Sequence, residues 1–346
     1  MRILSLWHYK QIDDLMMTTV NDSMDYSFRK LAEKHDFHLL SLASKTYPYF
    51  MKDNIKFYFV KTPDELLRYA NNIRPEIVLL NDFNEKFNNT ILDRYKGKAK
   101  FILYYHGGDI YNNVATRWRE ISALVVAHNF QKEQLVAHGV DKTKIFINPY
   151  GADINIMRPN LLLERIYDVV YVSYFNHYKR QQILIDSLRT FNGSVLLVGH
   201  FKDNPYLGGS WLQERIKQAN DLNKWDRLTF VSWPCRDRIS SFINMAKIGF
   251  FGGGNHESGP RVVPEMMACG LPVVAFNDCT AVKTFVTNET GWLVEPHAVK
   301  LGNLLNSIIS DNSSIIAKSL KAEKMIRDDF SYDTMANRWE EVLNSI

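Results

Sequence analysis

One segment, FFGGGNHESGPRVVPEMMACGLPVV at positions 250–274, constrains the fold of this chain more than any other. The apolar run over 246–251 predicts a buried strand, which three consecutive glycines end. Pro260 suits the first turn of a helix, where its missing N–H costs nothing, and a second apolar strand follows over 271–275. Strand, turn, helix and strand in this order predict the parallel crossover unit of an α/β sheet.

The turn and helix of this segment also suit a ligand. A helix that starts after glycines presents unpaired backbone N–H groups and the positive end of its dipole, which stabilise an anionic phosphate. Glu257 and Glu265 lie two helical turns apart, so both can face one cleft and bind separate hydroxyl groups. Two isolated glutamates are more often a solvated helix face, but the surrounding pattern favours a sugar-nucleotide site.

This pattern resembles glycosyltransferase family 4, the retaining nucleotide-sugar transferases whose two Rossmann-like domains face each other across a cleft in the GT-B fold. In that family, two glutamates at this spacing close the donor site, and a small-residue turn and a Leu-Pro-Val-Val strand follow. The resemblance implies that Glu257 contacts the donor hexose and Glu265 the ribose hydroxyls. By the same resemblance, backbone amides of Gly259 to Val262 hold the sugar and the diphosphate, and the donor-binding residues of this segment are Ser258, Gly259, Pro260, Arg261 and Val262.

A strand over 101–105 ends in His-Gly-Gly-Asp, at the carboxyl edge where a parallel sheet delivers functional side chains. The family places a histidine here that meets the donor sugar, which implies a catalytic role for His106. A lone histidine is more often a structural residue. Asp109 suits the N-cap of the following helix. Residues 124–153 resemble the last strand, helix and interdomain turn of the family's first domain, and they predict the hinge.

The strand that opens the second half leads to Lys179. In the family this strand ends in Gly-Arg and a Lys-Gly pair follows, and the arginine and lysine neutralise the donor diphosphate. Lys179 matches the pattern, but Ser173 and Tyr174 replace Gly-Arg, and Arg180 replaces the second glycine. Because charge-assisted contacts are roughly twice as strong as neutral ones, we hypothesise that Arg180 substitutes for the missing arginine. The alternative is a surface Lys-Arg pair.

Two further turns in the second half resemble donor contacts of the family. Gly199 belongs to a segment similar to the Val-Gly-Asp-Gly turn, and FVSWPC over 230–235 is similar to the strand end that contacts the base. Trp233 would stack on that base, although a tryptophan buries a large surface wherever it lies.

The acceptor side departs from the family. Many members carry paired glycines after the first strand, but this chain continues with Trp-His-Tyr-Lys at positions 7–10. Residues after the strands of the first half are candidates for the acceptor pocket, and their types suit many hydroxyl compounds: His8, Asp13, Asp14, Asn81 and Asp82.

The length of 346 residues suits two domains of about 150 residues each. In the family the C-terminal helix crosses back to the first domain, and here Met335, Trp339, Val342 and Leu343 form one apolar face. We therefore assign residues 1–155 and 331–346 to an acceptor-side domain, and residues 156–330 to a nucleotide-sugar-binding domain.

Composition bounds the cellular setting. The chain has no apolar run of about 18 residues and Met1 leads directly into a strand, so we expect a cytoplasmic protein without a signal sequence. The three cysteines lack the spacing of a disulfide framework or a zinc site. A net charge of +4 allows peripheral contact with the inner membrane face or with nucleic acid without requiring either.

The sequence predicts transfer of a hexose from a nucleoside-diphosphate sugar, such as a UDP- or GDP-hexose, to a hydroxyl acceptor, a glycan or a lipid-linked sugar. Lys179 and the helix N-terminus would stabilise the leaving diphosphate, so no metal or other cofactor is expected. Retention of anomeric configuration follows from the resemblance. The alternatives are a transferase acting on modified bases in DNA, a non-catalytic nucleotide-sugar-binding partner subunit, and an epimerase. A dehydrogenase is disfavoured because Gly-x-Gly-x-x-Gly follows neither first strand.

Overall fold

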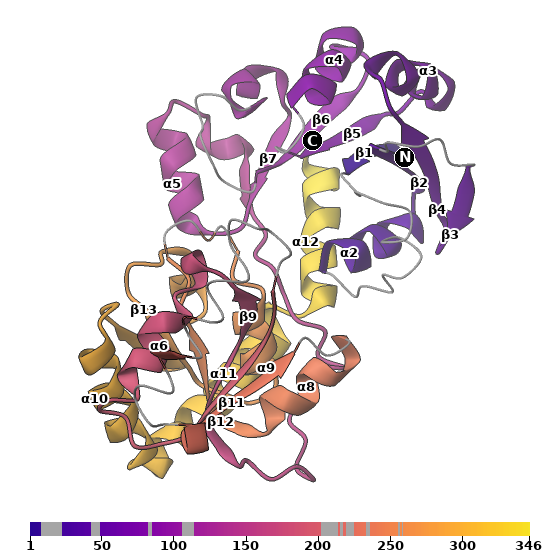
Figure 1. Cartoon of the computed structure of the whole chain (residues 1–346). Helices are drawn as coiled ribbons and strands as arrows, with labels where there is room; N and C mark the ends of the chain where they lie inside the picture. The colour runs from indigo at the N-terminus through magenta and orange to yellow at the C-terminus, as the bar shows by residue number, and fades with distance from the viewer. Residues whose placement is uncertain are drawn as a thin grey trace. The chain divides into compact units, whose positions relative to one another are not determined.

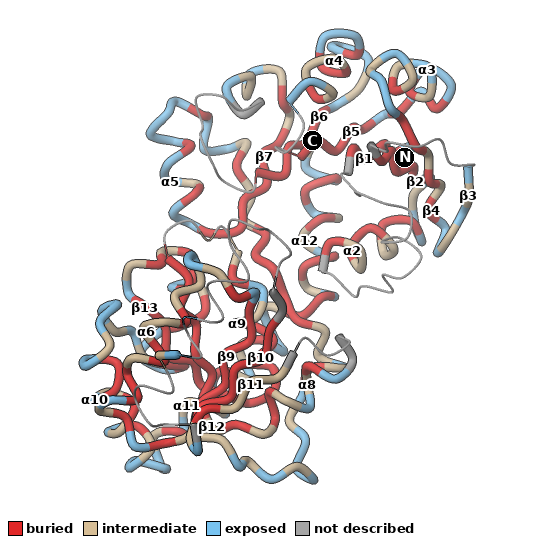
Figure 2. The backbone as a smooth tube through the Cα atoms, in the orientation of Figure 1, coloured by how far each residue is buried: buried red, intermediate tan, exposed pale blue. Residues whose placement is uncertain are grey.

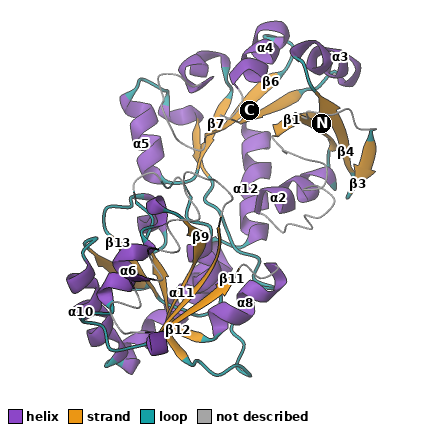
Figure 3. Ribbon diagram, in the orientation of Figure 1, coloured by secondary structure: helices purple, strands orange, loops and turns teal. Residues whose placement is uncertain are grey.

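The computed structural model describes residues 1–7, 23–42, 49–81, 85–105, 114–201, 214, 217–218, 225–232, 236–254, 257 and 259–346. The chain divides into two compact units, one formed by Met1–Pro149 with Tyr332–Ile346 and the other by Tyr150–Ser331 (Figure 1). Residues 150–155 and Ser331, which the sequence assigned to the first domain, group with the second unit. Each unit contains a sheet with helices against it (Figure 3).

The sheet of the first unit has the strand order β3-β4-β2-β1-β5-β6-β7-β8. Its pairs are parallel except β3 with β4, which a turn with positive φ at Asp53 and Asn54 connects. β5 and β7 are buried along their whole length, which suits the apolar sequence of β7 and of the first four residues of β5. The strands are β1 (Arg2–Trp7), β2 (Asp36–Leu42), β3 (Phe50–Lys52), β4 (Ile55–Val60), β5 (Ile77–Asn81), β6 (Lys100–Tyr105), β7 (Ala123–Val126) and β8 (Ile145–Ile147).

Helices of the first unit begin with clear local signals. At α3, the Thr62 side chain accepts from the Glu65 N–H at 3.3 Å, and the Glu65 carboxylate accepts from the Lys61 N–H at 2.7 Å. Pro63 occupies the first position, where no N–H is needed. The helices are α2 (Ser23–Ala32), α3 (Pro63–Ile73), α4 (Glu85–Tyr95), η2 (Val114–Glu120), α5 (Asn129–Ala137), η3 (Lys142–Lys144) and α12 (Tyr332–Ser345).

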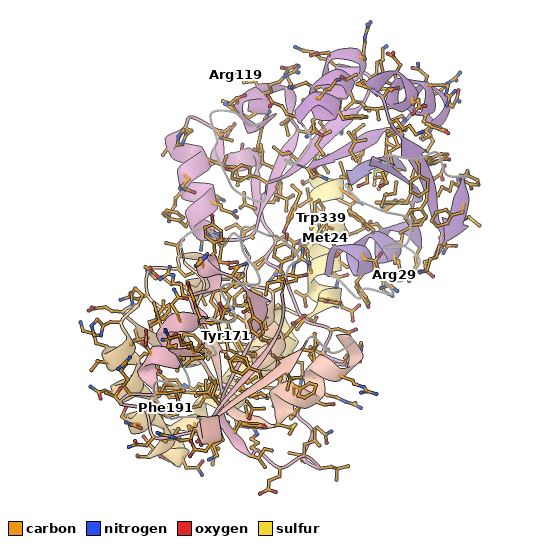
Figure 4. All side chains as sticks on the ribbon, in the orientation of Figure 1. Met24, Arg29, Arg119, Tyr171, Phe191 and Trp339 are labelled. Atoms are coloured by element: carbon orange, nitrogen blue, oxygen red, sulfur yellow. The ribbon has the colours of Figure 1, made fainter. Side chains whose placement is uncertain are left out.

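The C-terminal helix α12 packs into the first unit. Trp339 is fully buried, and its ring centroid lies 5.7 Å from that of Tyr104 on β6 (Figure 4). The Asn148 side-chain amide donates to the Met335 carbonyl at 3.1 Å. All four residues predicted for the apolar face of this helix are buried, namely Met335, Trp339, Val342 and Leu343.

The sheet of the second unit is parallel throughout, in the order β11-β10-β9-β12-β13-β14. The strand order reverses between β9 and β12, which makes this position the topological switch point. The strands are β9 (Tyr167–Phe175), β10 (Val195–Phe201), β11 (Leu228–Ser232), β12 (Ala246–Phe251), β13 (Val273–Phe276) and β14 (Gly291–Val294).

Helices flank the second sheet, and its strands are mostly buried (Figure 2). The predicted helix after the glycines exists but begins at Val262, so Pro260 precedes it and accepts from the Val263 N–H at 3.0 Å. The helices are η4 (His177–Lys179), α6 (Gln181–Ser187), η5 (Trp225–Arg227), α8 (Arg236–Asn244), α9 (Val262–Ala268), η6 (Ala281–Thr284), α10 (Ala298–Ile309) and α11 (Asn312–Asp329). Across the residues with described placement, none of the helices has the length and apolar character needed to span a bilayer.

The N-cap of α5 makes the stability of the first unit sensitive to acid. His128 is buried, its Nδ1 accepts from the Gln131 N–H at 3.4 Å, and burial lowers its pKa to about 4. Between pH 6.5 and 4 the unfolded chain binds a proton at His128 that the folded chain does not. The free energy of unfolding therefore decreases as the pH is lowered through that range. We expect His128 to contribute a loss of about 2–3 kcal/mol in the free energy of unfolding between pH 7.5 and 4.5.

His128→Asn retains a capping side chain without the titration, so its stability should fall less over the same pH range. Urea unfolding of both proteins at pH 7.5 and 4.5 measures the difference. Equal losses in the two proteins would show that His128 is not the group responsible.

Candidate functional site

The predicted site residues of the second unit lie in two loops at the carboxyl edge of its sheet. β9 leads into the turn 177–180, and β12 leads into the glycines 252–254 and then to Glu257. These two strands are neighbours at the switch point, where ligands bind in open α/β sheets. The topology therefore brings together residues that separate sequence motifs had nominated.

Lys179 and Glu257 form an ion pair between these loops, although 78 positions separate them in the sequence. The Lys179 ammonium contacts Glu257 Oε1, and the two side chains are only 20% and 17% exposed. The ammonium also lies 5.8 Å from the centroid of the Phe251 ring. A carboxylate and an ammonium shielded to this degree interact more strongly than an exposed surface pair.

Two hydrogen bonds fix the backbone of Lys179, one at its carbonyl and one at its N–H. Tyr171, which Figure 4 labels, is fully buried. Its hydroxyl donates to the Lys179 carbonyl at 2.6 Å, and burial raises the Tyr171 pKa far above its ordinary value. Asn176 Oδ1 accepts from the Lys179 N–H at 3.1 Å. A Cβ at Gly252 would lie 2.6 Å from the Lys179 carbonyl oxygen, so this approach requires glycine.

Arg180 is not an exposed surface cation. Its backbone has φ 51° and ψ 34°, in the left-handed region, and its side chain is 20% exposed. Nη1 lies 2.8 Å from Asp278 Oδ2, and the guanidinium lies 5.4 Å from the centroid of the Phe276 ring. Contact between Arg180 and a donor diphosphate stays a prediction, because in this structure Asp278 binds the guanidinium.

The turn before α9 is tightly packed. A Cβ at Gly259 would lie 2.3 Å from two carbon atoms of the Tyr150 ring, and the Arg261 guanidinium lies 4.8 Å from the centroid of the same ring. The Arg261 N–H donates to the Gly259 carbonyl at 2.9 Å. Glu265 is buried in the first turn of α9, while Pro260 is buried and Val262 is half-buried.

Gly199 has a structural reason to be glycine, whether or not it contacts a ligand. It lies in β10 beside Ser173 of β9, and a Cβ there would lie 2.2 Å from the Ser173 carbonyl oxygen. Asn81, a candidate for the acceptor pocket, is buried and donates to the Leu6 carbonyl at 2.7 Å, which links β5 to β1. The other candidates lie outside the described residues, namely His8, Asp13, Asp14, Asp82, His106, Trp233 and Ser258.

Sequence reasoning missed three residues of this site: Tyr150, Tyr171 and Asp278. Asp278 follows β13 closely, so its place at the carboxyl edge of a predicted strand was an available signal. Tyr150 and Tyr171 carried no such signal, since their roles depend on contacts with Gly259 and with the Lys179 carbonyl. In the described part of the chain, no three His, Cys, Asp or Glu side chains are grouped as a metal site would need.

The support of Lys179 by Tyr171 is testable. Tyr171→Phe keeps the ring but removes the donor to a shielded carbonyl, so the free energy of unfolding should fall by about 1–2 kcal/mol. Tyr178→Phe, a change at a 60% exposed side chain of the same loop, is the control and should have little effect. Urea unfolding compares the two, and equal losses would contradict the role of the Tyr171 hydroxyl.

Comparison with solved structures identifies the fold. HepE from Anabaena, in complex with UDP, superposes with a TM-score of 0.79 at 16% identity and covers 100% of both chains. Sucrose-phosphate synthase from Thermosynechococcus elongatus gives a TM-score of 0.76 at 16% identity, over 100% of this chain and 99% of that one. The predicted fold class, α/β with two Rossmann-like domains of the GT-B type, is confirmed.

Sequence comparison points to the same group. A GDP-mannose-dependent alpha-(1-6)-phosphatidylinositol monomannoside mannosyltransferase of Mycobacterium tuberculosis is 24% identical over 177 residues. The match covers 48% of this chain and 44% of the mycobacterial protein, so it spans less than half of that relative. Residues 153–327, half of the chain, match the family described as glycosyl transferases group 1. The chain belongs to the glycosyl transferases group 1 family.

Proposed function

We propose that this protein is a retaining, metal-independent glycosyltransferase that moves a hexose from a nucleoside-diphosphate sugar to a hydroxyl of a glycan or a lipid-linked acceptor. The observation that carries the proposal is the Lys179–Glu257 pair at the switch point of the second sheet. It joins a cation suited to a diphosphate with a carboxylate suited to sugar hydroxyls. Family membership supports the proposal, as do the UDP and UDP-glucose complexes of the structurally similar HepE.

The Lys179 ammonium has three N–H donors, so it can keep one bond to Glu257 and donate others to diphosphate oxygens. As the bond from the anomeric carbon to the diphosphate breaks, negative charge grows on the leaving group. Tyr171 and Asn176 fix the Lys179 backbone, and Glu257 holds the ammonium at the end of the side chain, so the cation would stabilise that charge with little rearrangement. Glu257, turned toward the hexose, would accept hydrogen bonds from its hydroxyls.

The remaining roles follow from the family resemblance. Glu265 would bind the ribose hydroxyls, and backbone N–H groups of the segment 259–262 would hold the sugar and the diphosphate, although Pro260 has no N–H and the Arg261 N–H donates to the Gly259 carbonyl. His106 would orient the donor near its reacting carbon, and Trp233 would stack on the base. Gly199 and Ser258 complete the set of residues for which the resemblance implies donor-side roles, whereas Arg180 stands where the family has a glycine and takes no role from the resemblance.

Donor binding is the first test. Wild type and Glu265→Ala would be heated with UDP-, GDP-, ADP- and CMP-sugars, because ligand at 100 times its dissociation constant adds about 2.7 kcal/mol of stability. We expect one nucleotide series to raise the melting temperature of wild type, and Glu265→Ala to lose that shift. Glu164→Ala, at an exposed position of the same unit, is the matched control and should keep it.

No shift with any sugar nucleotide would contradict the proposal. A shift without release of nucleoside diphosphate, across a set of glycan and lipid-linked acceptors, would favour the non-catalytic partner subunit. The replacement of the family's Gly-Arg by Ser173 and Tyr174 is the observation that keeps this second candidate open.

Metal independence has its own test. Because Lys179 would supply the charge that a divalent cation supplies elsewhere, donor turnover should be unchanged after treatment with EDTA. Lys179→Ala should lower turnover by about 100-fold, the scale seen when a group that stabilises developing charge is removed. Release of nucleoside diphosphate measures both. A loss in EDTA that Mg²⁺ or Mn²⁺ restores would overturn metal independence while leaving the transferase proposal intact.

A further inference from the structure

Arg180 occupies a backbone conformation that glycine adopts freely and other residues adopt at a cost. Its φ of 51° places it in the left-handed region, between the end of η4 and the start of α6. The family resemblance puts glycine at this position. An arginine here therefore needs compensation from its side chain, which is mostly buried.

The side chain reaches across the carboxyl edge of three neighbouring strands. It starts after β9, and its guanidinium binds Asp278, which follows β13, at 2.8 Å. β12 lies between those two strands in the sheet. The second carboxylate oxygen, Asp278 Oδ1, is buried and has no hydrogen-bond partner in the described part of the chain. Asp278 thus directs its one bonded oxygen to Arg180.

The guanidinium lies directly against the glycine turn that follows β12. A Cβ at Gly254 would lie 1.8 Å from Arg180 Nη2, so the turn and the side chain fit each other closely. The Gly254 carbonyl accepts from the Glu257 N–H at 3.0 Å. That bond links the backbone of Glu257, whose carboxylate contacts Lys179, to the turn that Arg180 packs against.

Four charged side chains at this edge of the sheet form two ion pairs. Lys179 binds Glu257 and Arg180 binds Asp278. We propose that Arg180 and Asp278 form a brace that fixes the turn 252–254 and holds Glu257 at Lys179, so that Arg180 is a positioning residue for the sugar and not a ligand of the diphosphate. The part of this inference that concerns the sugar rests on the proposed function.

A double-mutant cycle separates the two roles. Arg180→Gly removes the side chain and leaves a residue that adopts the left-handed region without steric cost. Asp278→Ala removes the carboxylate that binds the Arg180 guanidinium. Calorimetric titrations with UDP, UDP-glucose, GDP and GDP-mannose would be made on wild type, both single variants and the double variant. We expect each variant to bind the sugar nucleotide about tenfold more weakly, the double variant no more weakly than the singles, and the nucleoside diphosphate to bind as before.

Two results of the binding measurements would overturn the brace. Weaker binding of UDP or GDP itself in Arg180→Gly, persisting in the Asp278→Ala background, would make Arg180 a direct diphosphate ligand. Additive losses would mean that the two residues act separately. Lys247→Ala is the matched control. Lys247 pairs with Asp168 at 2.7 Å near the amino-terminal ends of β12 and β9, away from the carboxyl edge that carries the site. This variant should bind all four ligands as wild type does.

A measurement without ligand keeps the two proposals distinguishable. Hydrogen–deuterium exchange at the Glu257 amide should be faster in Arg180→Gly and Asp278→Ala than in wild type and Lys247→Ala, since that amide bonds to the braced turn. Unchanged exchange would sink the brace even if donors bind. Faster exchange in a protein that binds no donor would support the brace while the proposed function fails.

Discussion

The contact between Lys179 and Glu257 sets the conditions that the rest of the second unit satisfies. Two charges that are four-fifths shielded from water need each other, because either one left alone there would lose its hydration without compensation. They meet only because β9 and β12 are adjacent and parallel, so that both strands deliver their following loops to one edge. Gly252 then lets the β12 loop approach the Lys179 carbonyl, to which the Tyr171 hydroxyl donates.

Much of the local structure around this contact was predictable from the sequence. The strand 246–251 and the helix that ends before Gly270 follow from apolar runs and glycines whose signals lie within a few residues of each other. The start of α9 was placed two residues early, because Pro260 suits the turn before a helix as well as its first position. The order of the strands was not derivable from such local patterns, and the family resemblance supplied only the Rossmann-like class of the two domains.

Contacts between distant segments set the limit of sequence reasoning at the site. Asp278 is 98 positions from Arg180, and nothing near either residue indicates the other. The same limit affects Gly199 and Asn81, both nominated for ligands. In the fold, the Ser173 carbonyl requires the glycine, and the asparagine links two strands of the first sheet. A residue at the carboxyl edge of a sheet can serve to bind a ligand or to pack the fold, and only the contacts in the folded structure show which of the two applies.

At the end of β9, where the family has Gly-Arg, this chain has Ser173 and Tyr174, which form hydrogen bonds within the protein. Ser173 Oγ accepts from the Gln181 side-chain amide at 2.6 Å, and the same amide donates to the Tyr174 carbonyl at 2.7 Å. Gln181 is fully buried, so this end of β9 is closed by hydrogen bonds within the protein. Both cations of this loop are paired, Arg180 with Asp278 and Lys179 with Glu257, and Lys179 is the one that we propose for the diphosphate. On the proposed function, the hydrogen bonds to the Lys179 backbone would matter because a single ammonium would have to be correctly placed before the anion binds.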